Sequence, residues 1–102
     1  MNNSYLSEIF DFAKNILDIP SPSGYTDNVI NYIDEQIKTL GFPTSRTKKG
    51  NLLIEVKGKT NKTLGLSGHV DTLGAMVRSI TSDGDLKFTT IGGPIWPTLD
   101  GE

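Results

Sequence analysis

The sequence predicts an α/β fold in which two helices precede a series of strands. Residues 4–18 and 26–40 carry apolar residues at helical spacing, and a proline or a glycine follows shortly after each stretch. Residues 44–91 instead carry short apolar runs that alternate with turn residues. Helices and a sheet that bury apolar faces against each other make an α/β arrangement of layers.

Each predicted helix has a stripe of apolar residues and a capping signal. The first, residues 4–18, has Ser4 as its N-cap, and its stripe consists of Leu6, Ile9, Phe10, Ala13, Ile16 and Leu17. The second, residues 26–40, begins at Thr26 and ends before the C-cap glycine Gly41; its stripe consists of Val29, Ile30, Ile33, Ile37 and Leu40. Between the helices, Ser21-Pro22-Ser23-Gly24 is interpreted as a connector rather than a functional loop.

Short strands are expected at residues 44–47, 52–56, 63–67, 75–80 and 86–91. Asp83-Gly84 between the last two runs predicts a β-hairpin. Residues 63–67 are expected to form a buried interior strand, which implies more chain to cover it. We therefore expect the sequence to be the front part of a larger protein.

Composition excludes several classes of function. The chain has 102 residues, a net charge of -2 and no basic stripe, which argues against a nucleic-acid partner. It has no cysteine, so disulfides and thiolate metal sites are excluded. It shows neither a signal peptide nor an apolar run of about 20 residues, so a cytoplasmic protein without a membrane partner is expected.

The stretch from Gly65 to Val77, G-L-S-G-H-V-D-T-L-G-A-M-V, contains the only histidine, His69, and an aspartate two residues later, Asp71. Residues i and i+2 of an extended segment point to the same side, so the two side chains are expected to meet. An imidazole binds a metal through one nitrogen and commonly donates its other N–H to a carboxylate. Gly68 is expected to let the backbone turn. The alternative is a surface histidine whose neighbour is there by chance.

One histidine and one aspartate do not complete a catalytic metal site, which needs at least three protein ligands. The other carboxylates considered are expected to be solvated charges: Glu8, Asp11, Asp34, Glu35, Asp83, Asp85, Asp100 and Glu102. Trp96 is interpreted as part of a core whose other half is missing.

Three motifs resemble one family. They are Ser-Gly-His-Val-Asp-Thr-Leu-Gly-Ala-Met-Val, then Asp-Gly-Asp-Leu-Lys-Phe-Thr-Thr-Ile-Gly-Gly, and the early Ile-Pro-Ser-Pro-Ser-Gly-Tyr. Together they resemble the dinuclear metallo-aminopeptidases that assemble into tetrahedral dodecamers, which include glutamyl and deblocking aminopeptidases and proteins labelled endoglucanase or cellulase M. The resemblance runs in order over nearly the whole chain.

The resemblance implies roles for two residues and a division of the chain. His69 matches a metal ligand, and Asp71, the candidate catalytic residue, matches the aspartate that orients the imidazole. Residues 1–73 would be the N-terminal part of a metallopeptidase α/β sandwich. Residues 74–102 would begin an inserted β-barrel dimerisation domain with its first hairpin.

The resemblance also implies an activity for the complete protein. Two divalent metal ions per active site, zinc or cobalt, would serve the hydrolysis of N-terminal residues from peptide substrates in a homo-oligomer, from dimer to dodecamer. The family's remaining ligands and its catalytic glutamate follow the insertion, so this chain alone is expected to be inactive. Two alternatives stay open. One is a related metal-dependent carboxypeptidase or deacylase, which shares Gly-His-x-Asp-Thr, and the other is a non-catalytic interaction module.

Overall fold

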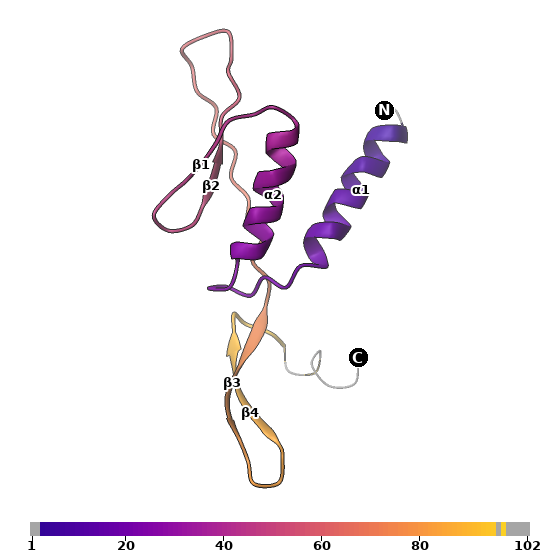
Figure 1. The fold of residues 1–102 in the computed structure, drawn as a ribbon, viewed down its shortest axis with the longest axis vertical. Helices are drawn as coiled ribbons and strands as arrows, with labels where there is room; N and C mark the ends of the chain where they lie inside the picture. The colour runs from indigo at the N-terminus through magenta and orange to yellow at the C-terminus, as the bar shows by residue number, and fades with distance from the viewer. Residues whose placement is uncertain (1–2, 96, 98–102) are drawn as a thin grey trace.

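The structure is a computed structural model that describes residues 3–95 and residue 97. Its elements are α1 (Asn3–Leu17), α2 (Asp27–Thr39), β1 (Thr44–Arg46), β2 (Leu52–Ile54), β3 (Gly74–Ile80) and β4 (Leu86–Ile91). In Figure 1 the two helices lie next to each other, β1 and β2 lie beside α2, and the β3–β4 hairpin extends away from the helices. The predicted order of two helices followed by strands is confirmed. The expectations for Trp96, Asp100 and Glu102 lie outside the described residues.

The molecule is extended and buries little surface. Its radius of gyration is 18.3 Å, whereas a compact domain of this length has about 13 Å. Its accessible surface is 9089 Å², against about 5,700 Å² for a compact protein of its mass. Among the described residues only Val29 and Ser21 are fully buried. The layers of an α/β sandwich are therefore not closed around a core in this part of the chain.

The helix ends match the predictions except at the first N-cap. Helix α1 begins at Asn3, so Ser4 lies inside the first turn, where its hydroxyl donates to Glu8 Oε1 at 3.1 Å instead of capping the helix. Thr26 is the N-cap residue of α2, although its side chain makes no capping hydrogen bond. Gly41 follows the C-cap with a φ of +81°, a conformation that glycine adopts without strain.

Helix α1 packs on α2 through a small contact. The rings of Phe12 and Tyr32 stack with their centroids 6.1 Å apart, and Asn15 Nδ2 donates to the Tyr32 hydroxyl at 3.1 Å. Much of the predicted apolar stripe of α1 is exposed, including Ile9 and Phe10. The stripe is amphipathic as predicted, but no layer of the described residues covers it.

Asp34 joins α2 to the β1–β2 pair. Its Oδ1 accepts a hydrogen bond from Thr44 Oγ1 at 2.6 Å, and its Oδ2 accepts one from Lys38 Nζ at 2.9 Å. Nearby, Arg46 Nη2 donates to Asn31 Oδ1 at 2.7 Å. The Asp34 side chain is only 14% exposed, so the expectation that it is a solvated charge is wrong. Lys38 first, and then Thr44, hold the pKa of Asp34 below its ordinary value.

The first strands are shorter and fewer than predicted. Strands β1 and β2 pair antiparallel, with Thr44 opposite Ile54. The predicted strand at 63–67 is wrong for this structure, because the segment has no partner strand among the described residues, and Leu64 is 84% exposed. A strand needs a neighbouring strand to satisfy its backbone groups, and an apolar run without one remains an extended segment.

The predicted hairpin is confirmed. Strands β3 and β4 pair antiparallel from Gly74 opposite Ile91 to Ile80 opposite Leu86, with a register shift between residues 77 and 79. In the turn, Gly84 has a φ of +91° and its N–H donates to a carbonyl three residues earlier. Neither strand contacts another helix or strand of the described chain. Whether this hairpin opens an inserted barrel stays a prediction.

Neither of the two helices described has the length and apolar character needed to cross a bilayer.

Candidate functional site

The segment at residues 69–72 is held against the loop between the two helices. The Thr72 N–H donates to the Ser21 carbonyl at 2.8 Å, and Ser21 Oγ donates to the Val70 carbonyl at 2.9 Å. Pro22 and Thr72 also form an isolated parallel bridge. Because Ser21 is only 1% exposed, these hydrogen bonds are partly shielded from water. The loop thus fixes the backbone on both sides of residue 71.

Gly74 permits this close approach. A Cβ added at Gly74 would lie 2.6 Å from the Cβ of Pro22, so any larger residue would push the loop away. Gly68, by contrast, has no positive φ and open space around it. The backbone angle and surroundings of Gly68 therefore do not by themselves require a glycine. The steric requirement lies six residues later, where the loop touches the chain.

The predicted approach of His69 and Asp71 is confirmed. His69 Nδ1 lies 3.0 Å from Asp71 Oδ1 and 3.3 Å from the Asp71 carbonyl oxygen. Both partners are acceptors when the carboxyl group is ionised, so the proton belongs on Nδ1 and the lone pair on Nε2. The His69 side chain is 85% exposed, which leaves Nε2 accessible. The roles of the two residues in catalysis and metal binding stay predictions.

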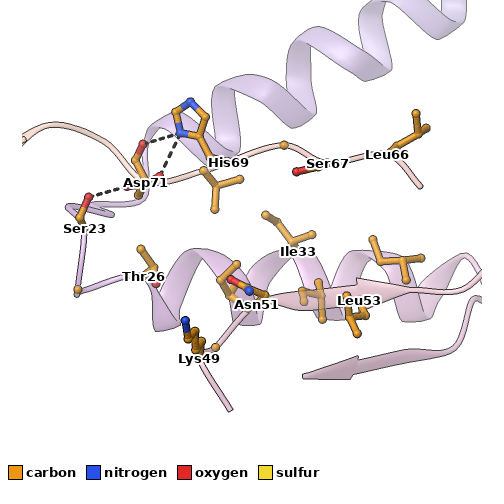
Figure 2. Close-up of a pocket in the computed structure, with 17 residues that line it drawn as sticks. Ser23, Thr26, Ile33, Lys49, Asn51, Leu53, Leu66, Ser67, His69 and Asp71 are labelled. Atoms are coloured by element: carbon orange, nitrogen blue, oxygen red, sulfur yellow. Dashed lines mark hydrogen bonds and ion pairs between the residues drawn. The ribbon is translucent and has the colours of Figure 1, made fainter. Parts of the chain in front are cut away.

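Ser23 joins His69 and Asp71 in one hydrogen-bonded cluster, a contact that was not predicted from the sequence. Its hydroxyl donates to Asp71 Oδ2 at 2.5 Å, so the two carboxylate oxygens have different partners (Figure 2). The interpretation of Ser21-Pro22-Ser23-Gly24 as only a connector is therefore incomplete. No local sequence pattern predicts a contact between positions 48 residues apart. The one available signal was the presence of hydroxyl groups on both sides of Pro22.

The hydrogen bonds lower the pKa of Asp71. The Ser23 hydroxyl has the largest effect and the His69 imidazole the next, while partial burial acts in the opposite direction. Donors that bond to a carboxylate favour its charged form. Asp71 is therefore an ionised acceptor at neutral pH, as the proton on Nδ1 of His69 requires.

An open cleft of about 770 Å³ adjoins the cluster. It lies between α2, β2 and residues 66–71, and its apolar lining includes Ile30, Ile33, Leu52, Leu53 and Leu66. Figure 2 shows His69 and Asp71 at one end of this cleft, next to Ser23. The imidazole thus lies at the edge of an open cleft of mixed polar and apolar lining that is large enough for a small ligand.

The residues present fit part of the coordination sphere of a metal centre. The accessible Nε2 of His69 is a suitable nitrogen ligand, and the carboxylate behind Nδ1 is the orienting group that such ligands usually have. No cluster of three or more His, Asp or Glu side chains in the described part of the chain could hold a metal ion. A complete site would need ligands from elsewhere.

Comparisons with known proteins agree with the resemblance seen in the motifs. The chain is 43% identical over 93 residues to the Bacillus subtilis (strain 168) protein named "Putative aminopeptidase YhfE". The aligned region covers 90% of this chain and 27% of that protein. It is 30% identical over 91 residues to a lysyl aminopeptidase of Pyrococcus furiosus, covering 88% of this chain and 26% of the relative. A glutamyl aminopeptidase of Lactococcus lactis subsp. cremoris is 27% identical over 88 residues, 84% of this chain and 25% of that protein.

The chain thus spans about a quarter of the length of the curated relatives that it matches. The model of the M42 glutamyl aminopeptidase family matches residues 50–102, which include both His69 and Asp71. This match covers more than half of the chain, and the chain therefore belongs to the M42 glutamyl aminopeptidase family.

Proposed function

We propose that this chain contributes a metal-ligating histidine to a dinuclear metallo-aminopeptidase. His69 would bind a divalent ion through Nε2, and Asp71 would hold the imidazole in the required orientation and tautomer. The observation that carries the proposal is the 3.0 Å contact between His69 Nδ1 and Asp71 Oδ1, which leaves Nε2 accessible. The same arrangement of carboxylate, imidazole and metal recurs in known metal sites.

The residues of this chain would perform a limited part of the chemistry. Two bound ions, zinc or cobalt, would supply Lewis acidity that polarises the scissile carbonyl and lowers the pKa of water. Asp71 would keep the proton on Nδ1 of His69, and the cleft would take part of the substrate. Because the described residues offer no cluster of three or more metal ligands, we propose that this chain alone does not hydrolyse peptides.

We propose peptides with a free N-terminus as substrates of the complete protein. The named relatives support an aminopeptidase, but one is named for lysyl and another for glutamyl residues.

The first test is calorimetric titration of the 102-residue chain with zinc and with cobalt. We expect weak binding that disappears in His69→Ala, because a single imidazole provides only part of the coordination sphere. Asp71→Ala should weaken binding by removing the orienting group. Equal binding by the wild-type chain and His69→Ala would remove His69 from the proposed site.

The second test places this chain in the context of a full-length relative. The aligned 91 residues of the Pyrococcus furiosus lysyl aminopeptidase would be replaced by those of this chain, and hydrolysis of aminoacyl anilides would be measured with divalent metal. We expect activity that His69→Ala abolishes, with circular dichroism to show that both hybrids fold. Release of C-terminal residues or of an acyl group would instead favour the related carboxypeptidase or deacylase.

A second proposal concerns assembly. Both strands of the hairpin expose large apolar residues, including Met76, Val77, Ile80 and Leu86, and its edges are unpaired by the described strands. We propose that this hairpin contributes to a homo-oligomer in the complete protein. Sedimentation at several concentrations, with and without metal, tests this. A monomer at every concentration would argue against assembly through this chain alone, and association unaffected by metal would favour an interaction role separate from catalysis.

A further inference from the structure

The Asp71 carboxylate is held at both ends. Its Oδ1 faces His69 Nδ1 at 3.0 Å, and its Oδ2 accepts the Ser23 hydroxyl at 2.5 Å. The side chains of Ser23, Asp71 and His69 are therefore linked in series by hydrogen bonds, from the interhelical loop to the imidazole. In such a chain each bond polarises and orients the next.

Burial anchors the backbone next to these three side chains, although the Ser23 side chain itself is exposed. Ser21, two residues before Ser23, is fully buried and bonded to the segment that carries Asp71, and Pro22 bridges to Thr72. By contrast, the Asp71 side chain is 41% exposed and His69 is more exposed still. Packing alone does not restrict the rotation of these two side chains. Apart from its contact with His69, the Asp71 carboxylate is therefore restrained, among the described hydrogen bonds of its side chain, by the one from Ser23.

The hydrogen bond from Ser23 can affect which nitrogen of His69 carries the proton. A free neutral imidazole carries its proton mainly on Nε2, the nitrogen that a metal would need. A correctly placed carboxylate moves the proton to Nδ1. We propose that Ser23 is a positioning residue of the metal centre, which orients Asp71 so that His69 keeps its proton on Nδ1. This inference rests on the proposed role of His69 as a metal ligand.

The imidazole itself can report on Ser23. Because His69 is the only histidine, a long-range proton–nitrogen correlation spectrum of the whole chain shows a single imidazole. The spectrum would be recorded without metal at alkaline pH. We expect the Nδ1–H tautomer to predominate in the wild-type chain and to lose its majority in Ser23→Ala. Ser23→Thr retains the hydroxyl and should restore the wild-type spectrum.

Three controls separate positioning from general damage. Ser67→Ala removes a hydroxyl two residues from His69 that has no hydrogen bond to Asp71 among those described, so the tautomer should not change. Ser23→Cys keeps the volume but donates weakly, so it should resemble Ser23→Ala even if the alanine variant loosens the loop. Hydrogen exchange of the Thr72 N–H shows whether the loop remains in place.

The result that overturns the proposal is a wild-type tautomer ratio in both Ser23→Ala and Ser23→Cys. A change of equal size in Ser67→Ala would overturn it as well. If Ser23 acts on the metal ligand, zinc affinity in Ser23→Ala should also fall by about tenfold, the lower end of the range for orienting groups. The tautomer measurement uses no metal. Its failure therefore refutes the role of Ser23 alone, whereas the absence of zinc binding that depends on His69 refutes the proposed function alone.

Discussion

The regions before and after Thr72 are held together in different ways. Before it, the important contacts join residues that are distant in sequence, such as Ser21 with Val70 and Ser23 with Asp71. After it, the β3–β4 hairpin is held by pairing between neighbouring strands around one turn. The first region brings chemically useful side chains together, whereas the second is a local unit that packs on no other described helix or strand.

This difference shows what positions the candidate site. The imidazole and its carboxylate are close in sequence, but their fixed placement depends on a loop 48 residues away. The hairpin, which is more regular, contributes no residue to the cluster of Ser23, His69 and Asp71. Substitutions in the two regions should therefore have separate effects, and amide hydrogen exchange can follow both regions in the same sample.

The largest effect is expected from Gly74→Val, at the junction of the two regions. The new Cβ would lie 2.6 Å from that of Pro22, so the loop must move away, at a cost of about 1–3 kcal/mol for overpacking. We expect faster exchange of the Thr72 N–H, which donates to Ser21. Gly65→Val is the matched control, because its Cβ would meet open space. Unchanged exchange at Thr72 would show that the close contact is unnecessary.

An intermediate effect, confined to the hairpin, is expected from Gly84→Ala. Gly84 has a φ of +91°, and an L-residue in a left-handed conformation costs roughly 1–2 kcal/mol. Amides of β3 and β4 should exchange faster, while Thr72 keeps its wild-type rate. Gly58→Ala, at an open position without a positive φ, should leave both regions unchanged. Faster exchange at Thr72 in Gly84→Ala would mean that the two regions are coupled.

The smallest effect is expected from acid, and it should act on the contact between α2 and β1. The pKa of Asp34 is lowered in the folded chain, chiefly by Lys38 and then by Thr44. Its contribution to stability is therefore present above the ordinary value of 3.8 and is lost as the pH falls through the lower folded pKa. Amide chemical shifts of β1 and β2 should show this acid transition, and Asp34→Asn should abolish it. The same transition in Asp34→Asn would assign it to another group.

Much of the local structure followed from sequence because its causes are local. The spacing of Val29, Ile30 and Ile33 predicted α2, and Asp83-Gly84 predicted the hairpin turn. The proximity of His69 and Asp71 was also predictable, since positions two apart in an extended segment share a side. The family was recognisable from the same motifs, and the comparison with known proteins confirmed it.

Only the tertiary structure decided which groups meet across long stretches of chain. The sequence by itself determined the helices, the hairpin and the pairing of imidazole with carboxylate. It did not reveal that Ser23 would bond to Asp71, that Asp34 would join α2 to β1, or that residues 63–67 would have no partner strand among the described residues. The reason is physical. Helix and turn preferences come from neighbouring residues, whereas a distant hydrogen bond or strand pair depends on the path of the backbone through space.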